Sequence, residues 1–326
     1  MKGFPILQDE VLVIRFLARR LFLTFFLLGC LSIIVFFAIR AIPGDMVQVM
    51  LGPGANEAAI TALRKSYGLD KPLIIQYSIW LVKVLQGDMG ESLRMGKPVL
   101  EEILTRFPVT LELITMAMGI ALLIAFPFGV ICAVKQNTWV DHLLRPISIF
   151  GLSIPDFWWA VMFIIIISNY LPQFYVFGYA SMFEDLGMNL KAVLPAAISL
   201  GIVEAAVTMR FIRSSLVEVL KADYITTARA KGLTETVTIG KHAIRNSLID
   251  VITVIGLQMG ALLSGAVLVE IVFGLPGLGR MTLDAVFQRD YPMVQGSVLF
   301  IAGFFILINL LVDILYSVLD PRIRVS

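Results

Sequence analysis

The stretch that decides the fold class is LFLTFFLLGCLSIIVFFAI, residues 21–39, which contains 19 residues and no charge. A helix of about 20 apolar residues crosses the hydrocarbon core of a bilayer, so this run predicts a membrane-spanning helix. The run is too long for the apolar region of a signal peptide, and RAIP at residues 40–43 is a poor small-residue cleavage site. We therefore expect this helix to be retained.

Five further apolar runs follow the first one. They are Leu113–Val134, Pro146 to about Pro172, Ala192–Met209, Val251–Val269 and Tyr291–Val312. Over the 326 residues, 58% are hydrophobic and 15% are charged, against roughly 25% charged in a soluble domain. This composition excludes a soluble enzyme, a disordered protein and a nucleic-acid binder. The sequence predicts an all-α integral membrane protein with six transmembrane helices.

Lysine and arginine are unevenly distributed between the apolar runs. With the N-terminus inside, the inner segments are 1–20, 135–145, 210–250 and 319–326, and the short outer segments are 171–192 and 270–291. The inner segments hold 15 basic residues in 80 positions, and the outer ones hold 3 in 44. Cytoplasmic loops are enriched in basic residues, so both termini are predicted to be cytoplasmic.

The long outer loop from Arg40 to Thr110 contains two predicted helices, at Asn56–Tyr67 and Pro72–Gln86. Proline suits the first turn of a helix. One face of the second helix is apolar, with Leu73, Tyr77, Trp80, Leu81, Val84 and Leu85. We expect this face to pack on the membrane bundle or to lie at the membrane interface; ligand binding is the alternative.

The inner loop 213–250 is the most polar part of the chain. Asp223 is expected to cap a short helix, Tyr224–Lys231, which Gly232 ends, and Thr234 is expected to cap a second helix. A helix–glycine–helix unit of this kind suits docking to another protein. The alternative is a solvated basic loop that only sets the topology.

The last outer loop reads FGLPGLGRMTLDAVFQRDYP, residues 273–292. It lacks the Gly-Lys-Ser/Thr ending of a phosphate-binding loop. Its glycines and prolines, Gly274, Pro276, Gly277 and Gly279, predict a defined turn that projects rigidly from the membrane edge. We expect this projection to touch a partner; a plain connector is the alternative.

Four acidic residues lie in or near the predicted spans: Glu112, Asp156, Glu204 and Asp313. Ionisable groups at membrane depth are costly and often mark a pathway. Glu204 is the deepest of them, and Asp156 follows a proline that can kink its helix. We expect Glu204 and Asp156 to line a translocation pathway; for Glu204, pairing with Arg210 is the structural alternative.

Catalytic and metal-binding patterns are absent from the sequence. It contains no His-Glu-x-x-His and no Gly-x-Ser-x-Gly, and its two histidines, His142 and His242, are far apart. Cys30 and Cys132 lie in apolar runs and are expected to be buried free thiols. We predict no catalytic residue, metal or cofactor on this chain. An ion-driven secondary transporter is an alternative, although no clear internal repeat supports it.

Several blocks, in order along the chain, resemble the permease subunits of dipeptide, oligopeptide and nickel ABC importers. The blocks are Arg40–Asp45, Tyr67–Asp70, Gln76-Tyr77, Trp80-Leu81, Gly87–Ser92, Arg106–Thr110, Asp223-Tyr224, Thr227–Gly232, His242–Asn246, Glu270–Phe273, Pro276–Gly279 and Arg289–Pro292. The resemblance runs from about residue 15 to the C-terminus. In the inner loop, Ala228 and Gly232 match the superfamily signature, whereas Thr226 and Thr227 replace its Glu-Ala pair.

The resemblance implies a type I ABC importer permease-like fold, with residues 21–39 as the first span. Residues 40–110 form an outer helical loop domain, residues 111–320 the permease core, and residues 1–20 and 321–326 the cytoplasmic ends. It implies a heterodimer with a second permease, two ATP-binding subunits that hold ATP and Mg, and an extracytoplasmic solute-binding protein. The location is the bacterial or archaeal cytoplasmic membrane.

The same resemblance assigns roles to the two loops. Coupling to the ATPase is assigned to Asp223, Tyr224, Ala228, Arg229, Ala230, Lys231 and Gly232, and docking of the binding protein to Gly277, Arg280, Asp284, Arg289 and Asp290. Peptides are the expected cargo, because nickel favours imidazole ligands and no histidine falls in a predicted span or outer loop. Nickel and oligosaccharides are the alternative cargoes.

Overall fold

The computed structural model describes residues 5–41, 47, 51, 56–66, 68–171 and 178–319. Parts of the block at 40–45, Tyr67, the outer end of the third predicted span at 172–177 and the C-terminal residues from 320 therefore lie outside the described residues. The chain divides into two compact units. One comprises Thr110–Leu275 with the two chain ends, and the other comprises Ala18–Val109 with Pro276–Ile306.

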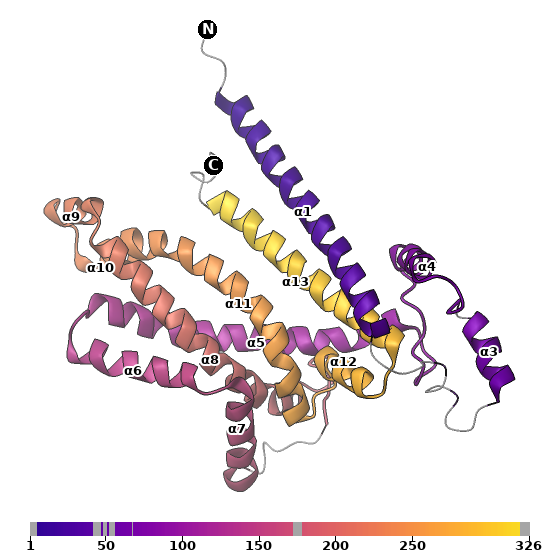
Figure 1. The fold of residues 1–326 in the computed structure, drawn as a ribbon. Helices are drawn as coiled ribbons and strands as arrows, with labels where there is room; N and C mark the ends of the chain where they lie inside the picture. The colour runs from indigo at the N-terminus through magenta and orange to yellow at the C-terminus, as the bar shows by residue number, and fades with distance from the viewer. Residues whose placement is uncertain are drawn as a thin grey trace. The chain divides into compact units, whose positions relative to one another are not determined.

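Among the described residues, five helices are long and apolar enough to cross a membrane (Figure 1). They are α1 (Pro5–Ala41), α5 (Val99–Val134), α8 (Leu186–Leu220), α11 (Ile244–Phe273) and α13 (Tyr291–Leu319). Each contains one of the predicted apolar runs, so these five predictions are confirmed. The helices extend beyond the runs because polar residues continue the same hydrogen-bonded turns; α5, for example, starts at Val99, well before the predicted run.

The third predicted span, from Pro146, is broken at the proline that was expected to kink it, and the break is sharper than a kink. The structure has two helices here, α6 (Trp139–Ser153) and α7 (Asp156–Tyr170), which are bent by 96°. Pro155 is the cause, because proline has no backbone N–H and disfavours helical backbone in the preceding residue. Ile154 accordingly has extended backbone, with φ −106° and ψ 127°. Counted as one span, the pair brings the total among the described residues to six.

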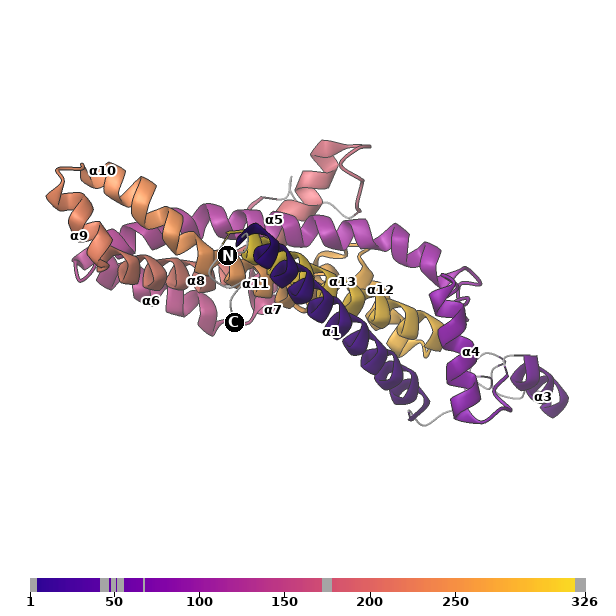
Figure 2. The ribbon, with the colours of Figure 1, turned by 90° about the horizontal axis from the view of Figure 1, so that it is seen from above.

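In the unit built on Thr110–Leu275, α8 is the central helix and packs against α6, α7 and α11 (Figure 2). Small residues let the backbones approach closely, as is usual between membrane helices. A Cβ atom at Gly201 would lie 2.8 Å from the backbone oxygen of Ala117 on α5. The core of this unit therefore depends on close helix contacts, which hold its functional side chains in fixed positions.

The other unit contains α3 (Glu57–Ser66), α4 (Leu73–Leu85) and α12 (Leu278–Phe287), with parts of α1, α5 and α13. Both loop helices predicted after the first span are present, although Pro72 is the N-cap of α4 and precedes its first turn. The core of this unit is made by buried apolar residues of α5, α12 and α13: Val99, Ile103, Leu278, Met281, Ala285 and Met293.

Candidate functional site

The predicted inner loop folds as a helix–glycine–helix segment, residues 223–240. It consists of α9 (Asp223–Ala230), α10 (Glu235–Val237) and the start of a short π-helix, η2 (Thr238–Ala243), that leads into α11. Gly232 has φ 81°, the left-handed conformation that glycine adopts without strain. The N–H of Gly232 donates to the Arg229 carbonyl and that of Leu233 to the Ala228 carbonyl, which ends α9 in a Schellman motif.

Two capping predictions in this segment are corrected by the structure. Ala222 is the N-cap of α9, and Asp223 is the first helical residue, where its charge favours the positive end of the helix dipole. Thr234 is the N-cap of α10 as predicted, but its side chain makes no capping hydrogen bond. The boundaries of α9 are therefore shifted by one residue from the prediction.

The segment stands on a buried apolar base. Ile225 is fully buried and packs with Ala133 of α5, Leu216 of α8 and Ala243 of η2. The Asn246 side-chain amide also donates to the Tyr224 hydroxyl at 3.0 Å. A force applied to α9 is therefore shared by three helices of the same unit.

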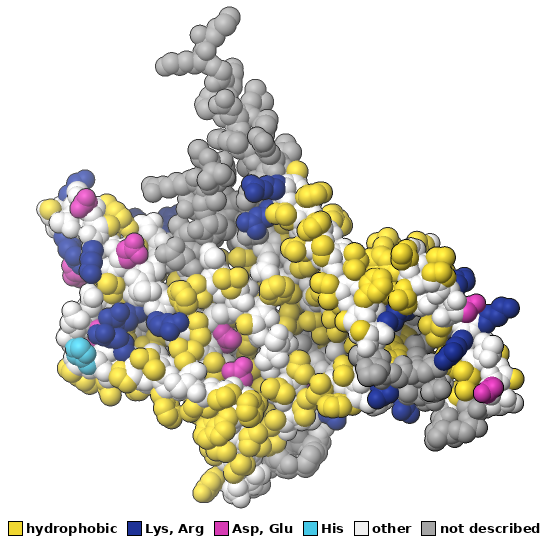
Figure 3. All heavy atoms as spheres, viewed as in Figure 1, with side chains coloured by type: hydrophobic (Ala, Val, Ile, Leu, Met, Phe, Trp, Pro, Cys, Tyr) yellow, Lys and Arg dark blue, Asp and Glu magenta, His cyan; other side chains and the backbone are white. Residues whose placement is uncertain are grey.

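The tip of the segment is exposed to solvent. Every residue from Arg229 to Val237 is exposed, and the Arg229 guanidinium donates to both oxygens of Glu235, at 2.8 and 3.3 Å, across the glycine turn. Basic and acidic side chains gather over α9 and α10 at the upper left of Figure 3. The ion pair fixes the shape of the tip, while Leu233 and Val237 remain exposed for a partner.

A buried ion cluster supports the neighbouring helices. Asp141 on α6 is fully buried, and its two oxygens accept hydrogen bonds from Arg145 at 2.7 and 3.0 Å and from Arg213 of α8 at 2.8 and 2.9 Å. The Asn137 N–H donates to the same carboxylate at 2.9 Å. The i,i+4 spacing of Asp141 and Arg145 was visible in the sequence, but the contact with Arg213 spans 72 residues and has no local signal.

The structure brings the two predicted pathway acids into one region. Glu204 on α8 is 9% exposed, and the Gln258 amide of α11 donates to its backbone oxygen at 3.3 Å while accepting from Thr208 at 2.8 Å. The Asp156 carboxylate lies against Gly265 of α11, and α7, which carries Asp156, packs against both α8 and α11. Within the described residues, Glu204 makes no ion pair with Arg210, so that alternative is wrong.

The predicted outer projection, residues 273–292, is mostly helical. Gly274 caps α11 with φ 69°, and residues 274–277 form the predicted turn; of the four predicted turn residues only Gly279 is helical, in α12. The turn prediction missed the spacing of Leu278, Met281 and Ala285, which all lie on the buried face of α12. Glycine near the start of a helix weakens its propensity only modestly, and the burial of this face compensates for it.

Two residues assigned to docking are buried, and the assignment of both as surface contacts is corrected. Gly277 is the buried N-cap of α12. Asp290 is 3% exposed, and its carboxylate accepts from the Ser92 hydroxyl at 2.5 Å and from the N–H groups of Leu93 and Met293 at 3.2 and 3.3 Å. Asp290 therefore holds the 92–94 turn onto the start of α13.

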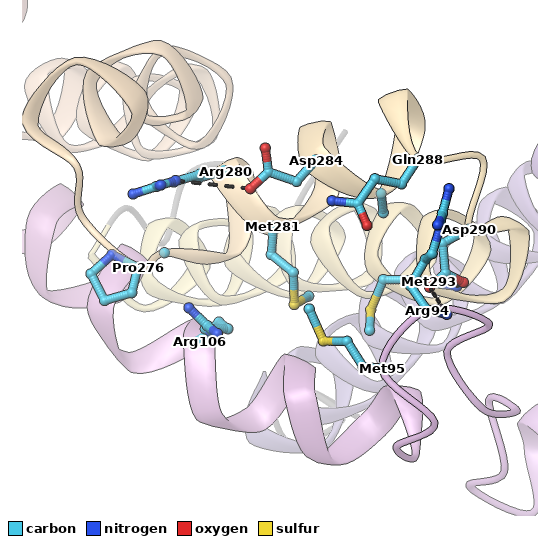
Figure 4. Close-up of a pocket in the computed structure, with 12 residues that line it drawn as sticks. Arg94, Met95, Arg106, Pro276, Arg280, Met281, Asp284, Gln288, Asp290 and Met293 are labelled. Carbon is cyan, nitrogen blue, oxygen red and sulfur yellow. Dashed lines mark hydrogen bonds and ion pairs between the residues drawn. The ribbon is translucent and has the colours of Figure 1, made fainter.

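The other three docking residues are accessible. The side chains of Arg280 and Asp284 are 42% and 57% exposed and lie 3.8 Å apart on one face of α12, and Arg289 is exposed. Beside them is a pocket of about 270 Å³, lined by Arg94, Met95, Arg106, Pro276, Gly277, Arg280, Met281, Asp284, Ala285, Gln288, Asp290 and Met293. Three methionine side chains lie in its middle, with Arg106 and Arg280 at one side (Figure 4).

Two further polar contacts link elements of the first unit. Thr110 donates to the fully buried carboxylate of Glu270 at 2.6 Å. The Tyr179 hydroxyl donates to Glu112 at 2.8 Å, and burial together with this hydrogen bond raises the pKa of Tyr179 well above its ordinary value. Glu112 is therefore paired with a side chain of the loop between α7 and α8. Within the described residues, no group of three or more His, Cys, Asp or Glu side chains could hold a metal ion.

Comparison with known proteins gives a consistent result along the chain. Residues 125–325 match the family described as binding-protein-dependent transport system inner membrane component, and residues 13–114 match the N-terminal family of the same membrane component. The dipeptide transport system permease protein DppB of Escherichia coli (strain K12) is 42% identical, with 96% of this chain and 99% of that protein covered. DppB of Alkalihalophilus pseudofirmus is 40% identical, with 96% and 100% covered.

A solved structure shows the same fold. A chain of the MetNI methionine ABC transporter, described in inward-facing conformations, matches with a TM-score of 0.55 and 18% identity. The match covers 69% of this chain and 100% of that chain. The helical membrane fold is therefore that of an ABC importer permease.

Proposed function

The chain belongs to the family of binding-protein-dependent transport system inner membrane components, and on this premise we propose that it forms half of the pathway of an ATP-driven importer of di- and oligopeptides. The observation that carries the cargo proposal is the 40–42% identity with dipeptide permeases over 96% of the chain. The protein is a multi-pass inner-membrane permease subunit. The other half of the pathway is a second, homologous permease.

The helix–glycine–helix segment receives the force of ATP hydrolysis. Its tip, residues 229–237, is exposed and polar, whereas Ile225 at its base is buried between three helices. A partner that moves the tip therefore moves α5, α8 and α11 together. ATP and Mg are held by two separate ATP-binding subunits, which dock on Arg229, Lys231 and the turn at Gly232.

This assignment fits the predicted topology, with both termini and the segment in the cytoplasm. The excess of lysine and arginine in the inner segments supports this orientation. The outer loop residues 40–110 and α12 then face the opposite side, where a solute-binding protein delivers cargo. Arg280, Asp284 and Arg289 are accessible polar residues of α12 and its C-terminal turn that suit this contact.

Glu204 and Asp156 face the translocation pathway. Carboxyl groups inside a helical bundle need water or polar groups nearby, and the packing of α7, α8 and α11 places both in the same bundle. Glu204→Gln should reduce transport severalfold while leaving assembly intact, because the amide preserves the size of the side chain. Unchanged uptake of every tested cargo would assign Glu204 a structural role.

The proposed function is tested by reconstituting the complete importer in vesicles with ATP inside. We expect uptake of labelled dipeptides that needs both ATP and the binding protein and is insensitive to an ionophore. Uptake that persists without ATP and is abolished by the ionophore would identify an ion-driven transporter. ATP-driven uptake of nickel or an oligosaccharide with no uptake of peptides would overturn the cargo.

A further inference from the structure

Helix α4 has apolar residues on nearly all sides, and only one face is covered. Tyr77 and Trp80 pack on Phe36 of α1, with ring centroids 5.3 and 5.5 Å apart. On the other faces Ile74, Val82 and Leu85 are 74%, 54% and 79% exposed. At 13 residues, α4 is about 20 Å long, which is too short to cross a hydrocarbon core of about 30 Å.

The contacts of α4 fix its depth along α1. The Tyr77 hydroxyl lies 2.8 Å from the hydroxyl of Ser32, inside the uncharged run of α1. Gln76 accepts from Arg40, which follows that run, at 3.2 Å. Ser32 and Arg40 are eight residues apart, or about 12 Å along the helix axis. The aromatic face of α4 therefore lies beside the uncharged run of α1, deeper in the membrane than Arg40 at the polar end of that run.

The two views of the ribbon in Figures 1 and 2 show that α4 crosses α1. Three α4 residues, Gln76, Tyr77 and Trp80, all meet one short stretch of α1, residues 32–40. Figure 1 shows α4 nearly end-on beside the C-terminal end of α1, and Figure 2 shows it from the side. Because α1 spans the membrane, α4 lies close to the membrane plane.

The side chains of α4 are distributed as this placement requires. Gln76 points toward Arg40 at the polar end of α1, and Lys83, seven residues later, lies on the same side of the helix. Tyr77 points toward Ser32, and the side of α4 beyond it carries Ile74, Leu81 and Leu85, spaced by seven and four residues. Gln76 and Lys83 are thus at the shallow side, and Ile74 and Leu85, the most exposed apolar residues of α4, are at the deep side.

We propose that α4 is an in-plane membrane helix whose Ile74–Leu81–Leu85 face rests on lipid acyl chains of the outer leaflet. The lipid-exposed surface of α1 continues to this face, since Ile33, Ile34 and Phe37 beside the contact are exposed and apolar. Ser78, the polar residue on the deep side, donates to the Ile74 carbonyl at 2.9 Å, which satisfies its hydroxyl internally. Tyr77 and Trp80 are residue types that anchor proteins at the membrane interface.

The test is spin-label accessibility in the complete importer, reconstituted in lipid nanodiscs. Nitroxides are attached at Leu85→Cys on the deep side and at Lys83→Cys, the matched control on the shallow side, after Cys30 and Cys132 are replaced by alanine. We expect the ratio of collisions with oxygen to collisions with a water-soluble nickel complex to be severalfold higher at Leu85. Equal ratios would overturn the proposal, as would a Leu85 label shielded from both reagents, which would indicate a covering protein.

A second measurement keeps both native cysteines. A photo-crosslinking amino acid at position 85 or 83 is activated in native membranes, and the adducts are identified by mass spectrometry. We expect lipid adducts at position 85 and several times fewer at position 83. An adduct at position 85 with the binding protein or the second permease, in place of lipid, would overturn the proposal.

Discussion

The helix–glycine–helix segment, residues 223–240, and the outer segment, residues 273–292, are built from similar parts but differ in where their polar groups point. In both, a left-handed glycine ends a helix, Gly232 with φ 81° and Gly274 with φ 69°. The first segment leaves its polar tip exposed, with an open space where a Cβ atom at Gly232 would lie. The second directs Asp290 inward to hold the 92–94 turn.

This difference suits the two roles proposed for these segments. In the proposed coupling element the tip is exposed, with its shape held by the Arg229–Glu235 ion pair, and the base is buried at Ile225. In the proposed docking segment α12 is packed through Leu278 and Met281, which keeps its shape independent of a partner. We therefore expect mutations of the buried residues under either segment to affect folding, and mutations at the exposed tip of residues 223–240 to affect partner binding.

The largest loss of stability is expected at the buried ion cluster below the tip. Asp141→Asn leaves two arginines facing a neutral amide in a buried site, which should destabilise the fold by about 3–5 kcal/mol. Thermal unfolding of the purified permease measures this effect. The matched control is Glu235→Gln, which breaks an exposed pair and should cost about 1 kcal/mol at most. Equal losses of stability from the two substitutions would contradict the distinction between the buried residues that support the segment and its exposed tip.

A smaller loss is expected in the proposed docking segment. Asp290→Ala removes a buried acceptor of several hydrogen bonds and leaves the Ser92 hydroxyl unsatisfied, at a cost of about 2–3 kcal/mol. Protease cleavage between Gln86 and Lys97 should become faster in the folded protein. Asp284→Ala, on the exposed face of the same segment, should change stability by about 0.5 kcal/mol or less. Normal protection of the turn in the Asp290 variant would show that the 92–94 turn needs no such anchor.

The smallest loss of stability, but a large loss of function, is expected at the tip. Gly232→Val forces a side chain into left-handed backbone, which costs about 1 kcal/mol or more, and disturbs the docking surface. The variant should insert and pair with the second permease but lose ATPase co-purification or ATP-driven uptake. Gly240→Val is the control, since Gly240 lies in η2 outside the docking tip at 229–237 and has equally open surroundings without a positive φ, and it should retain both activities.

The sequence predicted the elements that depend on hydrophobicity and local turn chemistry. Apolar runs identified five spans, and the Asp-to-Gly spacing around 223–232 identified α9 and its end. Hydropathy does not report the direction of a helix, so the apolar run around Pro155 gave no measure of the 96° bend there. Helix α12 was missed for a similar reason, because the glycines and proline at 274–279 predicted a turn, while the buried face of α12 depends on residues of α5 and α13.

Candidate site residues were predictable only where the signal is local. The position of Gly232 directly after a short predicted helix was enough to predict that it ends α9, and its left-handed backbone matches that prediction. Asp290 carried no sign of burial, because its partner Ser92 lies 198 residues away. The partner of Asp141 on α8 was missed for the same reason. Contacts between residues so far apart in the sequence depend on how the helices pack, and no single segment of the sequence carries that information.

The most direct test of the account is site-specific disulfide crosslinking in the assembled importer. Leu233→Cys at the exposed tip and Phe287→Cys on the exposed end of α12, which are 40% and 77% exposed, are paired with cysteines on the two kinds of partner. We predict that position 233 crosslinks to the ATP-binding subunit alone and position 287 to the solute-binding protein alone. A crosslink from position 233 to the binding protein, or none to the ATP-binding subunit, would contradict the assignment of residues 223–240 as the coupling element.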